Sequence, residues 1–368
     1  MSNMLIGREK HTLDTPLLCL DLDRMEANIR AMAEFCQEHG VFWRPHAKCH
    51  KNPGIAYREI QAGAIGVTCA KVSEAEVMAA GGVRDILIAN MIVGEQKLER
   101  IAALAGSSDP IVACDHYAQV EPLAAICRKR GVTVRVILEV DIGLNRVGTA
   151  PGKPSVELAQ AITNLQGVQF AGIMGYEGHL LTIPDLNEKR GKIQESMSIL
   201  ANTADQLVKS GIPCDIVSAG GTGSYQITAD CPGITELQAG GGIFMDPFYR
   251  DKCKVEGLDY ALTILATVVS RPQLEKAVLD CGRKTLGWNP EIHVPIVADY
   301  PDASVERMSA EHCELKLGPQ STRLKIGDKI ELVVGYGDLT TILHDNFYCF
   351  RKNILESVLP ILGRGKLQ

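Results

Sequence analysis

The sequence predicts an α/β protein: a (β/α)₈ TIM-like barrel plus a C-terminal β-rich domain, which the N-terminal strand could join. Short apolar runs, eight of them counted from the run at Phe42, alternate with amphipathic stretches, which is typical of a barrel. After about Val255 helical periodicity fades and Gly, Pro and Asp turns separate short apolar runs. The chain of 368 residues also exceeds the usual size of one domain.

The elements of the barrel follow in order along the chain. A strand at 15–22 precedes a helix that Asp23 caps and Gly40 ends. Ser73, with Glu76 three residues later, has the spacing of a capping box at the start of another helix. Further helices are expected near 54–62, 95–104, 155–164 and 187–209, and one that Gly131 ends. The eight barrel strands are expected at 41–43, 66–69, 86–89, 111–114, 133–140, 168–174, 213–218 and 236–239.

The C-terminal domain is expected to be mostly strands. Apolar runs at 262–269, 277–280, 325–334 and 347–350 predict strands, and 354–362 predicts a final helix. We therefore expect a barrel domain at 23–254 and a β-rich domain made of 1–22 and 255–368.

Composition excludes several classes of protein. A net charge of −6 and a pI near 5.9 provide no basic field for nucleic acid or an anionic membrane. No apolar run reaches the roughly 18 residues of a membrane span, and the N-terminus lacks the order of a signal peptide. Twelve cysteines without a C-x-x-C pair exclude zinc-ribbon spacing. The expected location is the cytoplasm.

Barrel active sites lie in the loops after the strands, so the residues that follow each run are candidates for chemistry. Lys48 follows the first run, and glycine-rich turns at 218–224 and 240–242 follow the seventh and eighth, where barrels commonly bind phosphate. A lysine facing a phosphate site indicates a phosphorylated substrate or pyridoxal phosphate, whose aldehyde forms a Schiff base with an amine. Arg44, His46, His50 and Lys51 are expected to lower the pKa of Lys48.

Six ordered motifs, at 15–23, 44–51, 71–76, 145–148, 220–225 and 236–240, carry a resemblance. In them the chain resembles the D-threonine aldolase and D-serine dehydratase family, pyridoxal-phosphate enzymes of the alanine-racemase fold type. The resemblance implies that Lys48 forms the Schiff base, that Arg146 lies beside the ring, and that the protein is a homodimer acting on a small amino acid. Other residues that it implies for cofactor binding are His46, Tyr176, Ser218, Gly220, Gly221, Thr222, Gly223, Gly240 and Gly241.

The chain departs from the family at the metal motif. The family's lyases hold a divalent ion (Mn, Mg or Zn) with a histidine and, two residues on, an aspartate or cysteine. Here Asp338 is kept, but Tyr336 replaces the histidine, and neutral tyrosine is a poor ligand for such ions. His312 and His344 lack ligand spacing, so neither is expected to form a metal site alone.

A second departure follows the sixth strand. Tyr176 is kept, while Thr182 occupies the place of a family histidine thought to deprotonate the β-hydroxyl. His179 stands nearer and could act as that base, or could instead orient Glu177.

The leading functional hypothesis is a lyase that cleaves a β-hydroxy-D-amino acid to glycine and an aldehyde. The first alternative is dehydration of D-serine or 3-hydroxy-D-aspartate to a keto acid and ammonia. The second is a racemase in which Lys48 opposes Tyr176 or His179. A non-catalytic pyridoxal-phosphate carrier is the third, although such carriers lack the C-terminal β domain.

Overall fold

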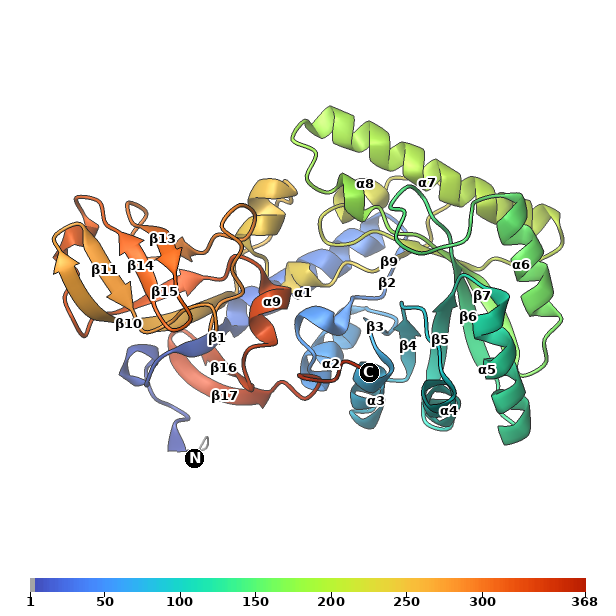
Figure 1. Ribbon diagram of the computed structural model, residues 1–368, viewed down its shortest axis with the longest axis horizontal. Helices are drawn as coiled ribbons and strands as arrows, with labels where there is room; N and C mark the ends of the chain where they lie inside the picture. The colour runs from blue at the N-terminus through green and yellow to red at the C-terminus, as the bar shows by residue number, and fades with distance from the viewer. Residues whose placement is uncertain (1–3) are drawn as a thin grey trace. The chain divides into compact units, whose positions relative to one another are not determined.

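The computed structural model describes residues 4–368 (Figure 1). The chain divides into two units: a barrel unit of Met32–Gly240 with Gly365–Gln368, and a β unit of the residues up to Ala31 with Gly241–Arg364. The division falls within helix α1 (Leu22–Glu38). This division differs from the expected domain boundaries after residues 22 and 254. The limits of the separately folding domains stay a prediction. Among the described residues, no helix is long and apolar enough to cross a membrane.

The barrel unit contains the predicted parallel strands, with helices packed along their outer side (Figure 1). Central strands such as β5 and β6 are buried along almost their whole length, because helices cover the sheet. The strands run in the order β2-β9-β8-β7-β6-β5-β4-β3. Their bounds are β2 (Phe42–Trp43), β3 (Val67–Cys69), β4 (Asp85–Ile88), β5 (Asp109–Cys114), β6 (Val134–Glu139), β7 (Val168–Met174), β8 (Ile216–Ala219) and β9 (Glu236–Leu237).

Backbone hydrogen bonds between the two end strands close this sheet into a barrel. The chain that continues from β2 forms a parallel bridge between His46 and Thr68, a residue of β3. The N–H of Thr68 donates to the carbonyl of Pro45 at 2.8 Å, and that of Ile65 donates to Trp43 at 2.9 Å. The predicted TIM-like fold class is confirmed. The helices are α2 (Pro53–Ala62), α3 (Val72–Ala80), α4 (Glu95–Leu104), α5 (Tyr117–Arg130), α6 (Lys153–Thr163), α7 (Leu186–Lys209) and the short α8 (Tyr225–Thr228).

The predicted capping box at Ser73 is wrong. Helix α3 begins at Val72, and its N-cap residue is Lys71. The Glu76 carboxylate faces α4 instead, where both of its oxygens accept hydrogen bonds from Arg100 at 2.6 and 2.7 Å. Glu76 therefore binds the neighbouring helix instead of capping its own helix.

A buried ion pair joins β2 to β9. The Arg44 side chain is 2% exposed, and its Nε lies 2.9 Å from Oε2 of Glu236, whose side chain is also 2% exposed. Nη1 of Arg44 lies 2.7 Å from Asp85 at the start of β4. The other oxygen of Glu236 accepts the Ser218 hydroxyl of β8 at 2.8 Å. One guanidinium thus connects strands from separate parts of the chain, four residues before Lys48.

The β unit is a nine-stranded sheet in the order β11-β14-β13-β12-β15-β10-β1-β16-β17. The N-terminal strand β1 is an interior strand of this sheet, antiparallel to β10 and parallel to β16, so the expectation that it joins this domain is confirmed. The strands are β1 (Leu17–Asp21), β10 (Leu262–Gln273), β11 (Lys276–Leu279), β12 (Ile296–Val297), β13 (Ser304–Met308), β14 (Cys313–Lys316), β15 (Lys329–Val333), β16 (Asn346–Arg351) and β17 (Ile354–Pro360). The unit also contains a short helix, α9 (Gly337–Thr341).

The helix predicted at 354–362 is wrong. These residues form β17, which pairs antiparallel with β16. The two strands are joined through Lys352 and Asn353, whose φ angles of 48° and 66° are those of a tight hairpin turn. Strands β12, β13 and β14 were not expected from the sequence either.

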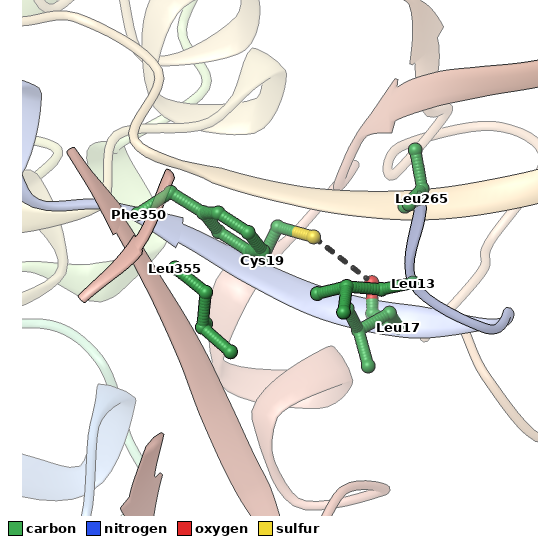
Figure 2. Close-up of a cluster of buried hydrophobic side chains, with 6 residues drawn as sticks. All are labelled: Leu13, Leu17, Cys19, Leu265, Phe350 and Leu355. Carbon is green, nitrogen blue, oxygen red and sulfur yellow. Dashed lines mark hydrogen bonds between the residues drawn. The ribbon is translucent and has the colours of Figure 1, made fainter. Parts of the chain in front are cut away.

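A compact apolar cluster lies around β1, as Figure 2 shows. Cys19 and Leu17 of β1 pack with Leu265 of β10 and Phe350 of β16, and all are buried. The Cys19 thiol donates to the carbonyl of Leu17 at 3.5 Å (Figure 2). The cluster joins the two ends of the sequence in a single core.

Leu265→Ala should lower the free energy of unfolding by about 2–5 kcal/mol, because it leaves a cavity in this cluster. Leu274→Ala is the matched control, since Leu274 is 72% exposed. Urea unfolding followed by circular dichroism measures both. Equal, small effects for the two variants would contradict the core that we describe.

Glu236→Gln should destabilise the protein by about 3 kcal/mol or more, because it leaves the buried Arg44 charge without one of its partners. Glu157→Gln removes the acid of an exposed pair with Lys153, with side chains 66% and 85% exposed, and should leave unfolding unchanged. The same urea titration compares the two. An unchanged free energy of unfolding in Glu236→Gln would show that the ion pair does not hold β2 to β9.

Candidate active site

Lys48 lies where barrel enzymes place chemistry, in the short 3₁₀ helix Ala47–Cys49 that follows β2. The backbone N–H of Lys48 donates to Nδ1 of His46 at 3.4 Å, and that of Lys51 donates to the carbonyl of Ala47 at 2.7 Å. The side chain of Lys48 is half-buried. The turn that carries Lys48 is therefore held by its own hydrogen bonds.

The basic residues around Lys48 have carboxylate partners, so they supply less positive charge than we expected. Lys51 lies 2.9 Å from Glu74, and Nε2 of His50 lies 3.3 Å from Glu59, with both of these last side chains fully buried. Burial, followed by the charges of Lys48 and Lys51, lowers the pKa of His46 well below its usual range, so this histidine is neutral. The expectation that His46 adds a charge beside Lys48 is therefore wrong.

Arg146 and Tyr176 meet across the loops after β6 and β7. The guanidinium carbon of Arg146 lies 5.7 Å from the centre of the Tyr176 ring, a cation–π contact. It also lies beside Glu139 at the end of β6, with 3.5 Å between Nη2 and Oε1. Burial raises the pKa of Glu139, and Arg146 opposes that shift. The Arg146 side chain is 57% exposed.

The glycine-rich turn after β8 is held by the buried carboxylate of Glu177. Its Oε1 accepts the Thr228 hydroxyl at 2.6 Å and its Oε2 accepts the Gly220 N–H at 3.4 Å. The N–H groups of Ser224 and Tyr225 both donate to the carbonyl of Gly221 at 3.0 Å, and Thr222 is 4% exposed. Gly223 completes the turn. The peptide backbone is thus arranged as a tight loop at the end of a strand, which suits an anion.

Ser218 is less suited to a phosphate than the sequence suggested. It is fully buried, its hydroxyl donates to Glu236 at 2.8 Å, and it accepts from the Gln238 side chain at 3.0 Å. The backbone N–H groups of the turn, rather than the Ser218 hydroxyl, are therefore the candidates for binding an anion.

Two glycines lie where a side chain could not fit. A Cβ on Gly221 would lie 2.9 Å from Cε2 of Tyr176, and one on Gly240 would lie 2.3 Å from the carbonyl oxygen of His46. The Cys49 thiol donates to the carbonyl of Gly240 at 3.4 Å, which joins the β9 loop to the Lys48 turn. Gly241 belongs to the β unit, where it lies against Tyr249. The amine, the close glycine turns and the aromatic ring of the barrel unit fit a planar cofactor with a phosphate group.

His179, the candidate base, and Thr182, which stands in the place of the family histidine, are both exposed. Nε2 of His179 lies 3.0 Å from the point that a Cβ on Gly143 would occupy, so the ring lies against the loop after β6. The bonds from Thr228 and Gly220 account for both oxygens of Glu177. Orientation of Glu177 therefore does not need His179.

The predicted metal motif, in the β unit, is occupied by side-chain contacts. The Tyr336 hydroxyl donates to Oδ2 of Asp338 at 3.2 Å, and its ring stacks on His293 with 4.6 Å between centres. Burial raises the pKa of Asp246 to about 7, and this residue accepts the N–H of Gly337 at 2.9 Å. Across residues 4–368, no three His, Cys, Asp or Glu residues gather as they would around a metal ion. At the motif itself, Asp338 offers a carboxylate, while the neutral phenol of Tyr336 is a poor ligand for a divalent ion.

His312 and His344 are the two other histidines considered as metal ligands. His312 is exposed, and Nε2 of His344 lies 2.8 Å from the carbonyl of Thr285. This hydrogen bond to the backbone indicates a structural role for His344.

Sequence reasoning missed two residues that the structure brings to these sites. His293 stacks on Tyr336 from a loop without regular periodicity, and no local signal marks it. Lys189 is buried in α7 and contacts the glycine-rich turn. Its signal was available, because it shares helical spacing with the buried Ile193, Met197 and Leu200.

Comparison with known proteins agrees with this arrangement. Residues 20–247 match the family model of the alanine racemase N-terminal domain, and residues 261–350 match that of a putative serine dehydratase domain. The chain is 35% identical to a D-threonine aldolase of Arthrobacter sp over 96% of this chain and 93% of the relative. It is 32% identical to a 3-hydroxy-D-aspartate aldolase of Paracoccus denitrificans over 98% of this chain and 94% of the relative.

A solved structure gives the same result in three dimensions. The D-threonine aldolase of Filomicrobium marinum superposes with a TM-score of 0.95 at 35% identity, covering 99% of both chains. The resemblance in the six motifs therefore extends over the whole fold. This chain belongs to the D-threonine aldolase family, with an alanine-racemase-type barrel followed by a serine dehydratase-type domain.

Proposed function

We propose that the protein is a pyridoxal-phosphate-dependent lyase that cleaves a β-hydroxy-D-amino acid to glycine and an aldehyde. The observation that carries this proposal is the position of Lys48, at the end of β2 and beside the Gly240 turn, in a family whose relatives include named aldolases. Bound pyridoxal phosphate supplies an electron-withdrawing ring for breaking a bond at the α-carbon. The barrel residues have to hold that ring and move protons around it.

Each barrel residue has a proposed part in this reaction. Lys48 provides the amine that holds the cofactor and gives way to the substrate amine. The backbone of 220–223 holds the phosphate, with the Gly240 turn behind it. Arg146 and Tyr176 lie beside the ring, and their mutual contact keeps a positive charge there. His46 is neutral and supports the Lys48 turn through its ring nitrogen.

His179 is the proposed base that removes the proton of the β-hydroxyl. An imidazole titrates near neutral pH, and this one is exposed in the loop that also carries Tyr176. Tyr176 is the alternative proton carrier, because its hydroxyl lies on the ring that faces Gly221.

The Tyr336–Asp338 hydrogen bond favours cleavage over dehydration. We propose that no ion is needed at this motif, because the phenol already occupies one oxygen of Asp338 and Tyr336 is a weak ligand. Hydroxide leaves poorly without a Lewis acid, whereas breaking a carbon–carbon bond needs only removal of the hydroxyl proton. The match to a putative serine dehydratase domain keeps β-elimination as the second candidate.

The family resemblance supports the proposed assembly, and composition and charge support the proposed location. We propose a homodimer in the cytoplasm, with a small amino acid as its substrate and no nucleic acid or membrane as its partner.

Incubation with D-threonine and with D-serine, followed by product analysis, tests the reaction. We expect glycine and acetaldehyde from D-threonine, and Lys48→Ala should abolish both this activity and the visible absorbance of bound cofactor. Lys192→Ala, at an exposed lysine with a side chain 49% exposed, should keep both. Ammonia with a keto acid would establish the dehydratase instead, and the L-enantiomer would establish the racemase.

Removal of metal ions tests the Tyr336–Asp338 pair. Activity should survive exhaustive chelation, because the phenol rather than an ion occupies Asp338. Tyr336→His rebuilds the histidine-and-aspartate spacing of the relatives, and this variant should bind Mn²⁺ in a titration where the wild type does not. Tyr336→Phe is the control, since it removes the hydroxyl without adding a ligand. Tight Mn²⁺ binding by the wild type, or its loss in His293→Ala, would refute the proposal.

A further inference from the structure

The first turn of α7 contains a lysine with an environment unlike that of its neighbours. Lys189 is 1% exposed, whereas the side chains of Arg190 and Lys192 are 50% and 49% exposed and pair with the exposed acids Asp230 and Glu188. Taking an ammonium group out of water is costly unless the site uses its charge or its hydrogen bonds. The burial of Lys189 therefore requires a reason in the site around it.

The Lys189 ammonium contacts the candidate phosphate turn directly. Nζ donates to the carbonyl oxygen of Gly223 at 2.8 Å, in a buried, charge-assisted hydrogen bond. At the other end of the same turn, the buried carboxylate of Glu177 accepts the N–H of Gly220 and the hydroxyl of Thr228. A buried cation and a buried anion thus hold the two ends of one five-residue loop at 220–224.

A positive charge in this position acts strongly on an anion in the turn. Water and salt screen exposed charges, while a buried charge acts through a medium of lower effective dielectric. The backbone N–H groups of the turn supply only partial charges, and the Ser218 hydroxyl is already bonded to Glu236. Lys189 is the buried cation that contacts this loop, through a hydrogen bond to the Gly223 carbonyl.

We propose that Lys189 is a positioning residue that makes the 220–224 turn selective for a phosphate dianion, the 5'-phosphate of the cofactor. It holds the Gly223 carbonyl on the protein side of the loop, and its charge favours the anion on the other. The inference rests on the proposed function, because it assigns the phosphate of pyridoxal phosphate to this turn. The alternative is a purely structural lysine that serves only as a donor to Gly223.

Two substitutions separate charge from shape. Lys189→Gln keeps an N–H donor for the Gly223 carbonyl but removes the charge, and Lys189→Met removes both. Lys192→Gln, one turn further along the exposed face of α7, is the matched control. Thermal unfolding of each variant without cofactor shows whether the fold is kept, and Lys189→Gln preserves the test if Lys189→Met does not fold.

The measurements are affinities of the cofactor-free protein for three probes: inorganic phosphate, pyridoxal phosphate, and pyridoxal, which lacks the phosphate. Lys189→Gln and Lys189→Met should bind both phosphate-bearing probes about 10- to 100-fold more weakly, as expected for the loss of a charged partner. Pyridoxal trapped on Lys48 by borohydride should be unchanged. The deficit should persist in concentrated salt, because a buried charge is poorly screened.

Three results would overturn the inference. Wild-type phosphate affinity in Lys189→Gln would show that the donor alone matters. An equal loss for pyridoxal and pyridoxal phosphate would show general damage to the site, and a deficit that disappears in salt would show a long-range surface effect. Failure of the proposed function is distinguishable: the wild type would then bind inorganic phosphate through Lys189 but form no adduct with pyridoxal phosphate.

Discussion

The buried ion pair between Arg44 and Glu236 is the contact on which the candidate site depends most. It joins the first strand of the barrel to the last, in a region where both strands are only two residues long and have few backbone bonds of their own. Glu236 extends the connection to Ser218 on β8, and Arg44 extends it to Asp85 on β4. Lys48, His46 and the Gly240 turn all follow these strands directly, so their positions are set by the pairing beneath them.

Several charged side chains near the candidate site lie close to a group of opposite charge. Lys51 pairs with Glu74, Arg146 lies beside Glu139, and Glu177 holds the turn that Lys189 contacts from its other end. Local pairing limits the cost of burying each group and prevents a broad positive field at the end of the barrel. An anionic ligand is then recognised by a few fixed groups rather than by a general attraction, which suits a site that must hold one cofactor in one orientation.

Much of the fold was predictable from the sequence because its strongest signals are local. The apolar runs at Val168–Met174 and Glu236–Leu237 are strands in the structure, and the lysine and glycine turns follow strands as expected. The errors arise where tertiary contacts decide. Arg100 draws Glu76 away from a capping role, and a left-handed turn at Lys352 and Asn353 makes a hairpin of residues whose apolar spacing resembled a helix. His293 and the burial of Lys189 depend on partners distant in sequence, which composition and spacing do not reveal.

The tyrosine at position 336 also has a genetic meaning. Tyrosine and histidine codons differ only in their first base, so a single transition converts the phenol that occupies Asp338 into the imidazole of the relatives' motif. The hydrogen bond from the N–H of Gly337 to Asp246 uses only the backbone, so it does not depend on the side chain at position 336. A variant that regains the histidine of the family motif is thus one nucleotide away from this sequence.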